Sequence, residues 1–567
     1  MAVKIQVNEY YIQLVAKSDD VEFQRLISTV KGIEKCRSRD TYRCSLRKLP
    51  EILKVLRNIE DANQLPEGSL VQRLFIEEMA RRKYTRSLKE LGPDMTSDWL
   101  WKHQCLGIEL AQINRRYNFF YDTRTGKTLM MLRIMYDRLK AGQAKKCLVV
   151  CPSGIIKSWL NDAAEHFPEL KLTAIYGDAA NRYEALFKPA HIVLWATEQV
   201  ANNLDILKKI HFDCCVFDES SKIKSHRTQI AAAARELSLT IPSWYNLSAT
   251  PAPNGKHEYY TQMMCLDPYV FSPARTHFVD KYFDNKSRNR NYEKLVVKWD
   301  MEKELMDIIE DYSIYVDQSA MPTAGKEWHI VPFSLSSAQA AYYDTMCSDM
   351  YAEVDGTTIV AEQAVAMRAK LNQIASGFIM DTEARKANAA NKKLGYAAEQ
   401  QAVYRIGDGA RIDCLKALLD SLNRAGAGKV VIWANYKEEF KMIEELLGDS
   451  ARYIHGGTSI TEKEQWIYRD FKAGPLQYLV CHPLSVGMGI NLTESHTAIY
   501  YSLNDSWEAF KQSSERIYGH INVQPHKCQY YILQATNTVN ELIYNNVANK
   551  RDASTGFLEH LKARALA

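Results

Sequence analysis

The chain has 567 residues, more than one hydrophobic core usually spans, so we expect two to four domains. Its 46% hydrophobic and 25% charged residues are the proportions of an ordinary soluble globular protein, and its net charge of +4 permits nucleic-acid binding without arguing for it. No apolar run approaches the roughly 20 residues that span a membrane, and Met1–Val7 lacks the apolar core of a secretory signal. We therefore expect neither a membrane protein nor a secreted one.

Residues 1–60 predict a small α+β domain at the start of the chain. Two β-rich stretches, Val3–Ala16 and Tyr42–Leu46, each precede a helical pattern, the first around Phe23–Ile27 and the second over Lys48–Ile59. The pattern includes no candidate catalytic residue, so it indicates an accessory domain.

Residues 61–95 are polar and helix-prone, and we expect them to form a linker or brace. They contain a basic cluster made of Arg81, Arg82, Lys83 and Arg86. Two interpretations stay open for this cluster, a solvated helical face or a surface that contacts phosphate groups.

The rest of the chain shows two regions, 96–265 and 396–550, in which short apolar runs alternate with helical patterns. Such alternation predicts a parallel sheet with helices on both faces. Residues 266–395 lose the alternation and are helix-rich and charged, which suggests a helical insertion, and 551–567 form a C-terminal tail. The expected strands are Asn118–Tyr121, Cys147–Cys151, Leu172–Tyr176, His191–Trp195, Cys214–Phe217, Trp244–Leu247, Val430–Trp433, Arg452–His455, Tyr478–Cys481, Ala498–Tyr501 and Cys528–Leu533.

A phosphate-binding loop is predicted at Tyr121–Thr128, between an apolar strand and the start of a helical pattern. In this context the backbone N–H groups and the helix N-terminus surround anionic oxygens. Lys127 would reach the β- and γ-phosphates of ATP, and the Thr128 hydroxyl would ligate Mg²⁺. The match is incomplete, because Tyr121 stands where the general pattern has its first glycine.

A second apolar strand ends in two carboxylates, Asp218 and Glu219, one strand-rich half-domain after Lys127. Asp218 is placed to hold Mg²⁺, directly or through water, and Glu219 to polarise the attacking water. Acidic residues are also common at exposed strand ends. Because the phosphate loop and the acidic pair occur together, the sequence predicts an ATP- and Mg²⁺-dependent hydrolase.

Taken in chain order, these motifs resemble those of superfamily 2 helicases, and specifically the Swi/Snf-like translocase branch. In the first region the similar segments are Leu100–Gln104, whose glutamine reads adenine in the family, Gly126–Thr128 (motif I), Cys151–Ser153 (Ia), Asp218–Ser221 (II) and Leu247–Pro251 (III). In the second region they are Val430–Trp433 (IV), His455–Gly457 in the turn after the next strand, Ser485–Leu492 (V) and Gln512–Arg516 (VI).

The resemblance implies two RecA-like lobes and ATP-driven translocation along duplex DNA. The ATP-binding residues would be Gln104, Thr125, Gly126, Lys127, Thr128, Gly489 and Arg516, with Arg516 as an arginine finger on the γ-phosphate. Sequence-independent DNA contacts would come from Ser153, Thr250, Gly457, Ser485 and Gly487. The stretch 266–395 resembles the helical protrusion of the branch, and the N-terminal domain resembles the HARP-type module of annealing helicases.

One position departs from the family, which usually has a second arginine three residues after Arg516. This chain has Gly519 there, followed by His520. If motif VI is helical, residue 519 lies one turn after Arg516 on the same face. The missing guanidinium removes a positive charge from the developing transition state, so the chain could also be a weakened ATPase.

We therefore predict an α/β protein with two RecA-like parallel-sheet lobes, a helical insertion and a small N-terminal α+β domain. It is expected to be a monomeric ATP- and Mg²⁺-dependent DNA translocase that remodels or anneals forks and junctions. The alternatives are an RNA-directed superfamily 2 helicase and a catalytically weak DNA-clamping or annealing protein. A cytoplasmic location in a bacterium or an infected host is expected, with the nucleus as the alternative, and protein partners do not follow from the sequence.

Overall fold

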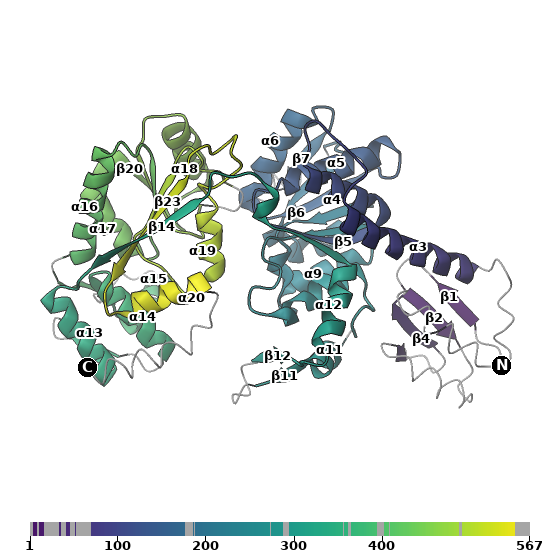
Figure 1. Cartoon of the computed structure of the whole chain (residues 1–567). Helices are drawn as coiled ribbons and strands as arrows, with labels where there is room; N and C mark the ends of the chain where they lie inside the picture. The colour runs from purple at the N-terminus through teal and green to yellow at the C-terminus, as the bar shows by residue number, and fades with distance from the viewer. Residues whose placement is uncertain are drawn as a thin grey trace. The chain divides into compact units, whose positions relative to one another are not determined.

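The computed structural model describes residues 4–7, 11–15, 33–35, 41–45, 52, 70–175, 185, 188–272, 274–286, 294–354, 357–360, 364–393, 402–407, 409–486 and 490–549. The chain divides into two compact units, Met1–Ala320 and Met321–Ala567, and each is described by itself (Figure 1). Within the described part of the chain, no helix combines the length and apolar character that crossing a membrane requires.

The N-terminal strands form a small antiparallel sheet in the order β1-β2-β4-β3. Its strands are β1 (Lys4–Val7), β2 (Tyr11–Val15), β3 (Glu34–Lys35) and β4 (Thr41–Ser45). Leu14 and Cys44 are fully buried, so the sheet has an apolar inner face. Both predicted β-rich stretches contribute strands. The helical patterns around Phe23–Ile27 and over Lys48–Ile59 lie outside the described residues, apart from Ile52.

Helix α3 (Leu70–Leu91) follows, and three of its arginines, Arg81, Arg82 and Arg86, are engaged within the first unit. Arg81 and Arg82 pair with Glu78 at 2.6 and 2.7 Å. Arg86 pairs with Asp311 at 3.0 Å. The guanidinium groups of this cluster therefore already have protein partners, and the assignment of 61–95 as a linker or brace stays a prediction.

The first unit contains a seven-stranded parallel sheet in the order β13-β5-β10-β9-β6-β8-β7. The strands are β5 (Arg116–Tyr121), β6 (Cys147–Cys151), β7 (Leu172–Ile175), β8 (Ile192–Ala196), β9 (Cys214–Phe217), β10 (Ser243–Leu247) and β13 (Ser313–Val316). Every residue of β6, β8, β9 and β10 is buried, as expected for parallel strands that are covered on both faces.

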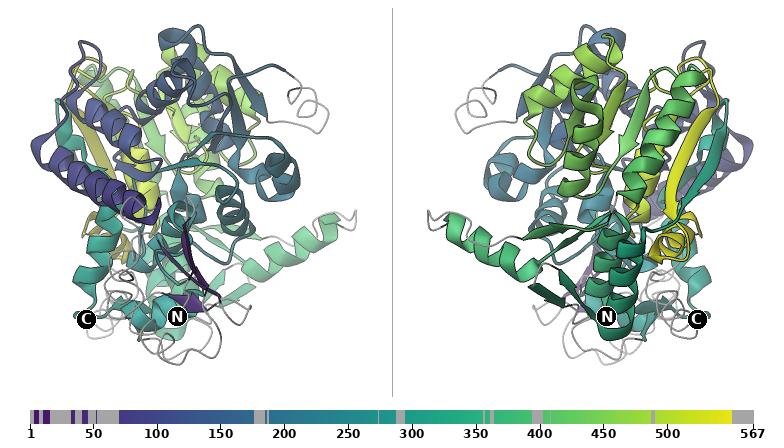
Figure 2. Two further views of the ribbon diagram at one scale, coloured as in Figure 1. Left: turned by 90° about the vertical axis from the view of Figure 1, so that its right-hand side faces the viewer. Right: turned by 90° about the vertical axis from the view of Figure 1, so that its left-hand side faces the viewer.

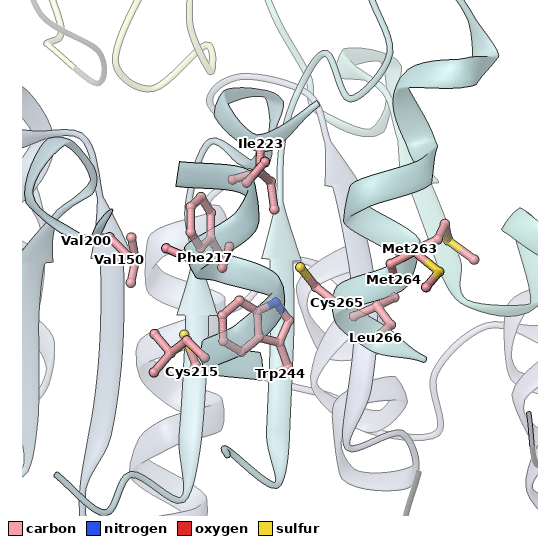
Figure 3. Packing of buried hydrophobic residues seen from close by; sticks show 14 of the residues in the cluster. Val150, Val200, Cys215, Phe217, Ile223, Trp244, Met263, Met264, Cys265 and Leu266 are labelled. Atoms are coloured by element: carbon pink, nitrogen blue, oxygen red, sulfur yellow. The ribbon is translucent and has the colours of Figure 1, made fainter. Parts of the chain in front are cut away.

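Helices cover this sheet and complete its core. They include α4 (Lys102–Ile113), α5 (Lys127–Lys140), α6 (Ile156–His166), α8 (Leu204–Lys209), α9 (Gln229–Ser238), α10 (Tyr259–Leu266), α11 (Arg275–Tyr282) and α12 (Glu302–Asp311). On one face Phe217 and Trp244, from adjacent strands, stack at 6.2 Å. Met263 and Cys265 of α10 belong to the same buried cluster (Figure 3). This packing fixes the strands whose ends carry the nucleotide motifs.

The second unit contains a six-stranded parallel sheet in the order β14-β23-β22-β19-β21-β20. Its strands are β14 (Lys326–Phe333), β19 (Val430–Trp433), β20 (Ala451–Ile454), β21 (Tyr478–Cys481), β22 (Thr497–Tyr500) and β23 (Cys528–Ala535). The main helices are α13 (Ser337–Asp349), α14 (Ala364–Ala375), α15 (Thr382–Lys393), α16 (Ala410–Arg424), α17 (Lys437–Leu447), α19 (Trp507–Ser514) and α20 (Val539–Asn549). The helices of this unit can be followed in the right-hand view of Figure 2.

The prediction of two parallel-sheet lobes is confirmed, but 266–395 is not purely helical. It supplies β13 to the first sheet and β14 to the second, and the division between the units falls inside it. Neither strand is a continuous buried apolar run. The second half of β13 is partly exposed, and β14 includes Lys326, Glu327 and His329 and is largely half-buried. Periodicity therefore gave no strand signal at these positions.

Candidate nucleotide site

The predicted nucleotide motifs of the first unit lie at the carboxyl ends of neighbouring strands. The phosphate loop follows β5, the acidic pair follows β9, and Ser248 follows β10, which pairs with both. In a parallel sheet the carboxyl ends of adjacent strands lie at one edge, where open α/β sheets bind their ligands. The sheet order therefore explains why these three segments meet.

The phosphate loop between β5 and α5 has a strained, closed conformation. Arg124 and Gly126 have φ angles of 62° and 75°, in the left-handed region that favours glycine. A Cβ on Gly126 would also lie 2.2 Å from Nε2 of Gln104. The loop therefore requires glycine at position 126 for both conformational and steric reasons.

Lys127, the first residue of α5, extends across this loop. Its Nζ donates to the carbonyl oxygens of Tyr121 and Asp122 at 2.7 and 2.9 Å. The Thr125 hydroxyl also donates to the Asp122 carbonyl, at 2.7 Å. Thr128 follows in the first turn of the helix. The ammonium thus lies beside the N-terminus of α5, where a phosphate group would be favoured.

Gln104 lies in the first turn of α4 and supports the loop. Its Oε1 accepts from the Trp101 N–H at 2.8 Å, and its Nε2 donates to the Gly126 carbonyl at 3.0 Å. The side chain is only 2% exposed. Nε2 of the neighbouring His103 lies 2.8 Å from the carbonyl oxygen of Thr125. Burial lowers the pKa of the His103 ring. Gln104 therefore positions the phosphate loop, and a contact with adenine stays a prediction.

Asp218 is buried behind the loop. Its carboxylate accepts from Nε1 of Trp159 at 3.1 Å and from the Glu219 N–H at 2.9 Å. Burial raises the pKa of this carboxyl to about 6, while the positive charge of Lys127 lowers it and the negative charge of Glu219 raises it. Asp218 and Lys127 therefore interact electrostatically, as a cation-binding carboxylate and a phosphate-binding lysine of one site would.

Glu219 is held by two serine hydroxyls. Its φ angle of 54° places it in the left-handed region, a strained conformation that is often found at functional sites. One carboxylate oxygen accepts from Oγ of Ser221 at 2.7 Å and from Oγ of Ser248 at 3.4 Å. Ser248 belongs to the segment after β10, so the acidic pair and the motif III segment are connected through Glu219.

A second connection runs through Gln262 of α10. The Ser220 hydroxyl donates to its Oε1 at 2.7 Å, and its Nε2 donates to the Pro251 carbonyl at 2.7 Å. Ser220, Ser221, Ser248 and Pro251 lie inside the predicted motifs without a predicted role, and Gln262 lies outside all of them. Only the fold brings α10 beside both motifs, so spacing alone offered no signal for Gln262.

The predicted DNA contacts are distributed over both units. Ser153 is exposed after β6, and in the second unit Gly457 is exposed in the turn after β20. Ser485 is half-buried after β21. Thr250 is only 5% exposed, and its hydroxyl has no hydrogen-bond partner within the described residues. Gly487 and Gly489 fall outside those residues.

Arg516 lies in the second unit, in the turn after α19, and is 9% exposed. Its Nη1 donates to the Ile490 carbonyl at 3.3 Å, and its own carbonyl accepts from the Leu492 N–H at 2.8 Å. These bonds attach motif VI to the end of motif V. The arginine is thus fixed within its own unit.

The expectation that Arg516 and Gly519 share a helical face is wrong, because α19 ends at Ser514. The hydroxyls of Ser513 and Ser514 donate to carbonyls three residues earlier in the helix, and such bonds compete with helical pairing. The Arg516 carbonyl is used by Leu492 instead of by a further helical turn.

The residues present fit ATP with Mg²⁺. Among the described residues no group of three or more His, Cys, Asp and Glu side chains could hold a metal ion. Mg²⁺ is usually held by one or two protein oxygens together with substrate phosphates. The Thr128 hydroxyl and the buried Asp218 carboxylate match that donor set, and a divalent cation would offset the unfavourable burial that raises the pKa of Asp218.

Two family models match the chain. An SNF2-related domain matches residues 119–392, and the helicase conserved C-terminal domain matches residues 410–519. Together the two matches span more than half of the chain, and they include all of the predicted catalytic residues.

Individual relatives are distant. Protein p41 of Acyrthosiphon pisum secondary endosymbiont phage 1 is 23% identical, and the alignment covers 78% of this chain and 93% of that protein. The ISWI chromatin-remodeling complex ATPase ISW1 of Saccharomyces cerevisiae is 22% identical over 75% of this chain but 37% of its own length. The DNA repair and recombination protein RAD54 of the same yeast is 21% identical over 76% of this chain and 52% of its own length. The chain thus spans about a third to a half of these two yeast proteins.

Among solved structures, the SWI2/SNF2 ATPase core of Sulfolobus solfataricus in complex with double-stranded DNA is 19% identical. The match covers 84% of this chain and 96% of that one, with a TM-score of 0.37. The two domain matches and the order of the motifs agree on one assignment. The chain belongs to the Swi/Snf-like branch of superfamily 2 and is a DNA-dependent ATPase of that family.

Proposed function

We propose that this ATPase translocates along duplex DNA and uses the movement to remodel or anneal branched DNA. The observation that carries the proposal is the hydrogen-bonded connection from Glu219 to Ser248, and from Ser220 through Gln262 to Pro251. A bound phosphate that moves Glu219 would also move the segment after β10. That segment is where the resemblance places a DNA contact, at Thr250.

The residues of the first unit divide the hydrolytic work. Lys127 and the N-terminus of α5 bind the phosphates, and Glu219 accepts a hydrogen bond from the attacking water and polarises it. Asp218 and Thr128 would hold Mg²⁺, which supplies positive charge to the phosphate oxygens. By the family resemblance, Arg516 would stabilise the charge that develops on the γ-phosphate.

The preference for branched DNA rests on the N-terminal domain and its resemblance to the HARP-type module. Deletion of residues 1–60 is expected to leave DNA-stimulated ATP hydrolysis within about threefold of the full chain while abolishing fork and junction remodelling. All nucleotide motifs follow residue 100, which is the reason for this expectation. Loss of ATP hydrolysis together with solubility would instead make the domain part of the core fold.

The decisive experiment measures ATP hydrolysis with no nucleic acid and with single-stranded, duplex, forked and four-way DNA, with an RNA duplex beside them. The proposal expects stimulation by DNA that contains duplex, strongest on the branched substrates. Stimulation by RNA alone would favour an RNA-directed helicase. Tight DNA binding with no stimulation would favour a DNA-clamping protein, the alternative that Gly519 motivates.

A further inference from the structure

The second unit contains a pocket of about 560 Å³ whose lining includes one residue of a motif segment, His455, and otherwise lies outside the motifs. Its lining combines aromatic and cationic side chains, namely Phe440, Lys437 and Lys441 of α17, Arg452 of β20, His455 after β20, and Trp466. Its volume lies in the range of small-molecule sites, roughly 300 to 1,000 Å³.

The pocket lies along the open edge of the six-stranded sheet, because β20 is its last strand (Figure 1). Phe440 packs into the core on one face of the sheet, whereas Ile467 packs into the core on the other. The edge is therefore flanked by α17 on one side and, on the other, by a π-helix over Gln465–Lys472 that carries Trp466. π-helical segments are rare and occur frequently at functional sites.

A peptide strand is a poor occupant of this edge. Nη1 of Arg452 donates to the carbonyl oxygens of Asp449 and Ala451 at 3.2 and 3.0 Å, and the Tyr453 hydroxyl donates to the Gly448 carbonyl at 3.2 Å. Ala451 begins β20, and Gly448 and Asp449 lie just before it, so both side chains lie beside the start of the edge strand. Charged side chains used in this way oppose the addition of a further strand.

The aromatic side chains suit a nucleobase. Phe440 and His455 meet edge-to-face, with ring centroids 5.7 Å apart, and Trp466 lines the same pocket. Aromatic side chains combined with cations form the usual platform for single-stranded nucleic acid, because every base has a π-face and every linkage has a phosphate. An unstacked base can use this platform, whereas a base inside a duplex is covered by its neighbours.

Side chains of opposite charge line the two ends of the pocket along α17. Lys437 begins the helix, Lys441 follows one turn later, and the acidic Glu444 and Asp449 line the other end. Lys441 pairs with Glu438 at 3.0 Å. Lys437 is exposed and has no partner within the described residues, so its ammonium is available to a phosphate. The carboxylates at the far end can accept from N–H donors of an unpaired base, such as the N3–H of thymine or the amino group of cytosine.

We infer that this pocket binds one unpaired nucleotide of a DNA strand, with its phosphate at Lys437 and its base against Trp466. The inference rests on the proposed function only in that DNA is the substrate. It adds a binding site for unpaired nucleotides to the ATPase core itself. The core as well as the N-terminal domain would then distinguish a fork or junction from plain duplex DNA.

The test measures binding of the full chain, without ATP, to a fluorescent single-stranded 12-nucleotide oligothymidylate and to a blunt 12-base-pair duplex by anisotropy. Trp466→Leu, which keeps an apolar side chain, should weaken oligothymidylate binding about tenfold. Lys437→Gln should weaken it about threefold and lower the salt dependence by about 0.7 in logarithmic slope. Duplex affinity should change less than twofold in both.

Two matched controls lie outside the pocket, Tyr468→Leu on the same π-helix and Lys416→Gln on the exposed side of α16. Neither should affect oligothymidylate binding. An equal loss on single strands and duplex, or no loss in either pocket variant, would overturn the inference. So would competition by free thymidine monophosphate as effective as that by the oligonucleotide. Because ATP is absent, failure of DNA-stimulated hydrolysis would refute the proposed function and leave this result standing.

Discussion

In the first unit, Lys127, Asp218 and Glu219 come from loops that follow β5 and β9, and Ser248 follows the strand between them. The order of the strands in one sheet is sufficient to bring these residues together. In the second unit, Arg516 lies in a turn after α19 and is attached to Ile490 and Leu492 of its own unit. Its proposed role at the γ-phosphate does not follow from the strand order of either sheet.

This contrast separates two kinds of catalytic residue. The phosphate-binding and water-polarising residues are organised by one folded core, so their effects should persist whatever the state of the other unit. The arginine belongs to a separately folded unit, so its effect on hydrolysis should be separable from that of the phosphate loop. Substitutions in the phosphate loop and acidic pair should therefore lower ATP turnover more than substitutions near Arg516.

The largest effect is expected for Lys127→Ala, which should lower ATP turnover at least about a thousandfold, with and without DNA. The substitution removes the ammonium that lies at the N-terminus of α5 and interacts with Asp218. Lys140→Ala at the exposed end of the same helix is the matched control and should retain turnover. Near wild-type hydrolysis by the Lys127 variant would show that the phosphate loop is not the nucleotide site.

Glu219→Gln should lower turnover roughly a hundredfold while ATP affinity stays within about threefold. The amide still accepts from Ser221 and Ser248 but cannot polarise water as a carboxylate does. Single-turnover hydrolysis and equilibrium binding of a fluorescent ATP analogue measure the two effects separately. If the variant binds no nucleotide, Glu219 serves to maintain the loop, and the strained conformation is structural.

Much of the fold could be predicted because the buried parallel strands are apolar runs. The predicted limits Cys147–Cys151 and Val430–Trp433 agree with β6 and β19 as observed. Two strands of the large sheets that the sequence did not predict, β13 and β14, carry polar residues and are partly exposed. They occur in a helix-rich context and join the sheets by long-range pairing, which no local pattern reports.

The contribution of Asp218 to the free energy of unfolding can be measured independently of catalysis. Burial raises its pKa to about 6 from 3.8, so the stability contributed by the protonated carboxyl is fully present below pH 3.8 and is lost as the pH rises through about 6. Asp218→Asn should therefore increase the free energy of unfolding at pH 7.5 by about 2 to 3 kcal/mol. The gain should disappear near pH 4.

Urea unfolding of the full chain at the two pH values, followed by tryptophan fluorescence, measures this difference. ATP with Mg²⁺ should then stabilise the wild type more than the variant, because the cation needs the carboxylate. A variant that is less stable than the wild type at pH 7.5 would show that the bonds from Trp159 and Glu219 outweigh the burial of the charge.

The site itself was predictable only in part. Lys127, Asp218 and Glu219 follow apolar strands, and the sequence reports both the strand and the residue type. The contact of Trp159 with Asp218 and the bridge through Gln262 depend on α6 and α10 packing against the sheet. Local spacing does not encode such contacts between distant elements. The same reason explains the error at Gly519, where the hydrogen bond between Leu492 and Arg516 competes with the helix.

The smallest effect is expected at Gly519. Position 519 is buried and, like Arg516, lies beyond the end of α19, so side chains at the two positions do not share a helical face. Gly519→Arg is therefore expected to leave DNA-stimulated turnover unchanged or to lower it through strain on packing, by less than about fivefold, since accommodating a larger buried side chain costs about 1 kcal/mol or more. Gly519→Ala, which adds a single methyl group, should stay within about twofold. Turnover and thermal unfolding of both variants separate a catalytic effect from a packing effect. A rise of tenfold with arginine but not with alanine would show that a guanidinium at position 519 stabilises the charge that develops on the γ-phosphate, as expected for the second arginine of the family pattern.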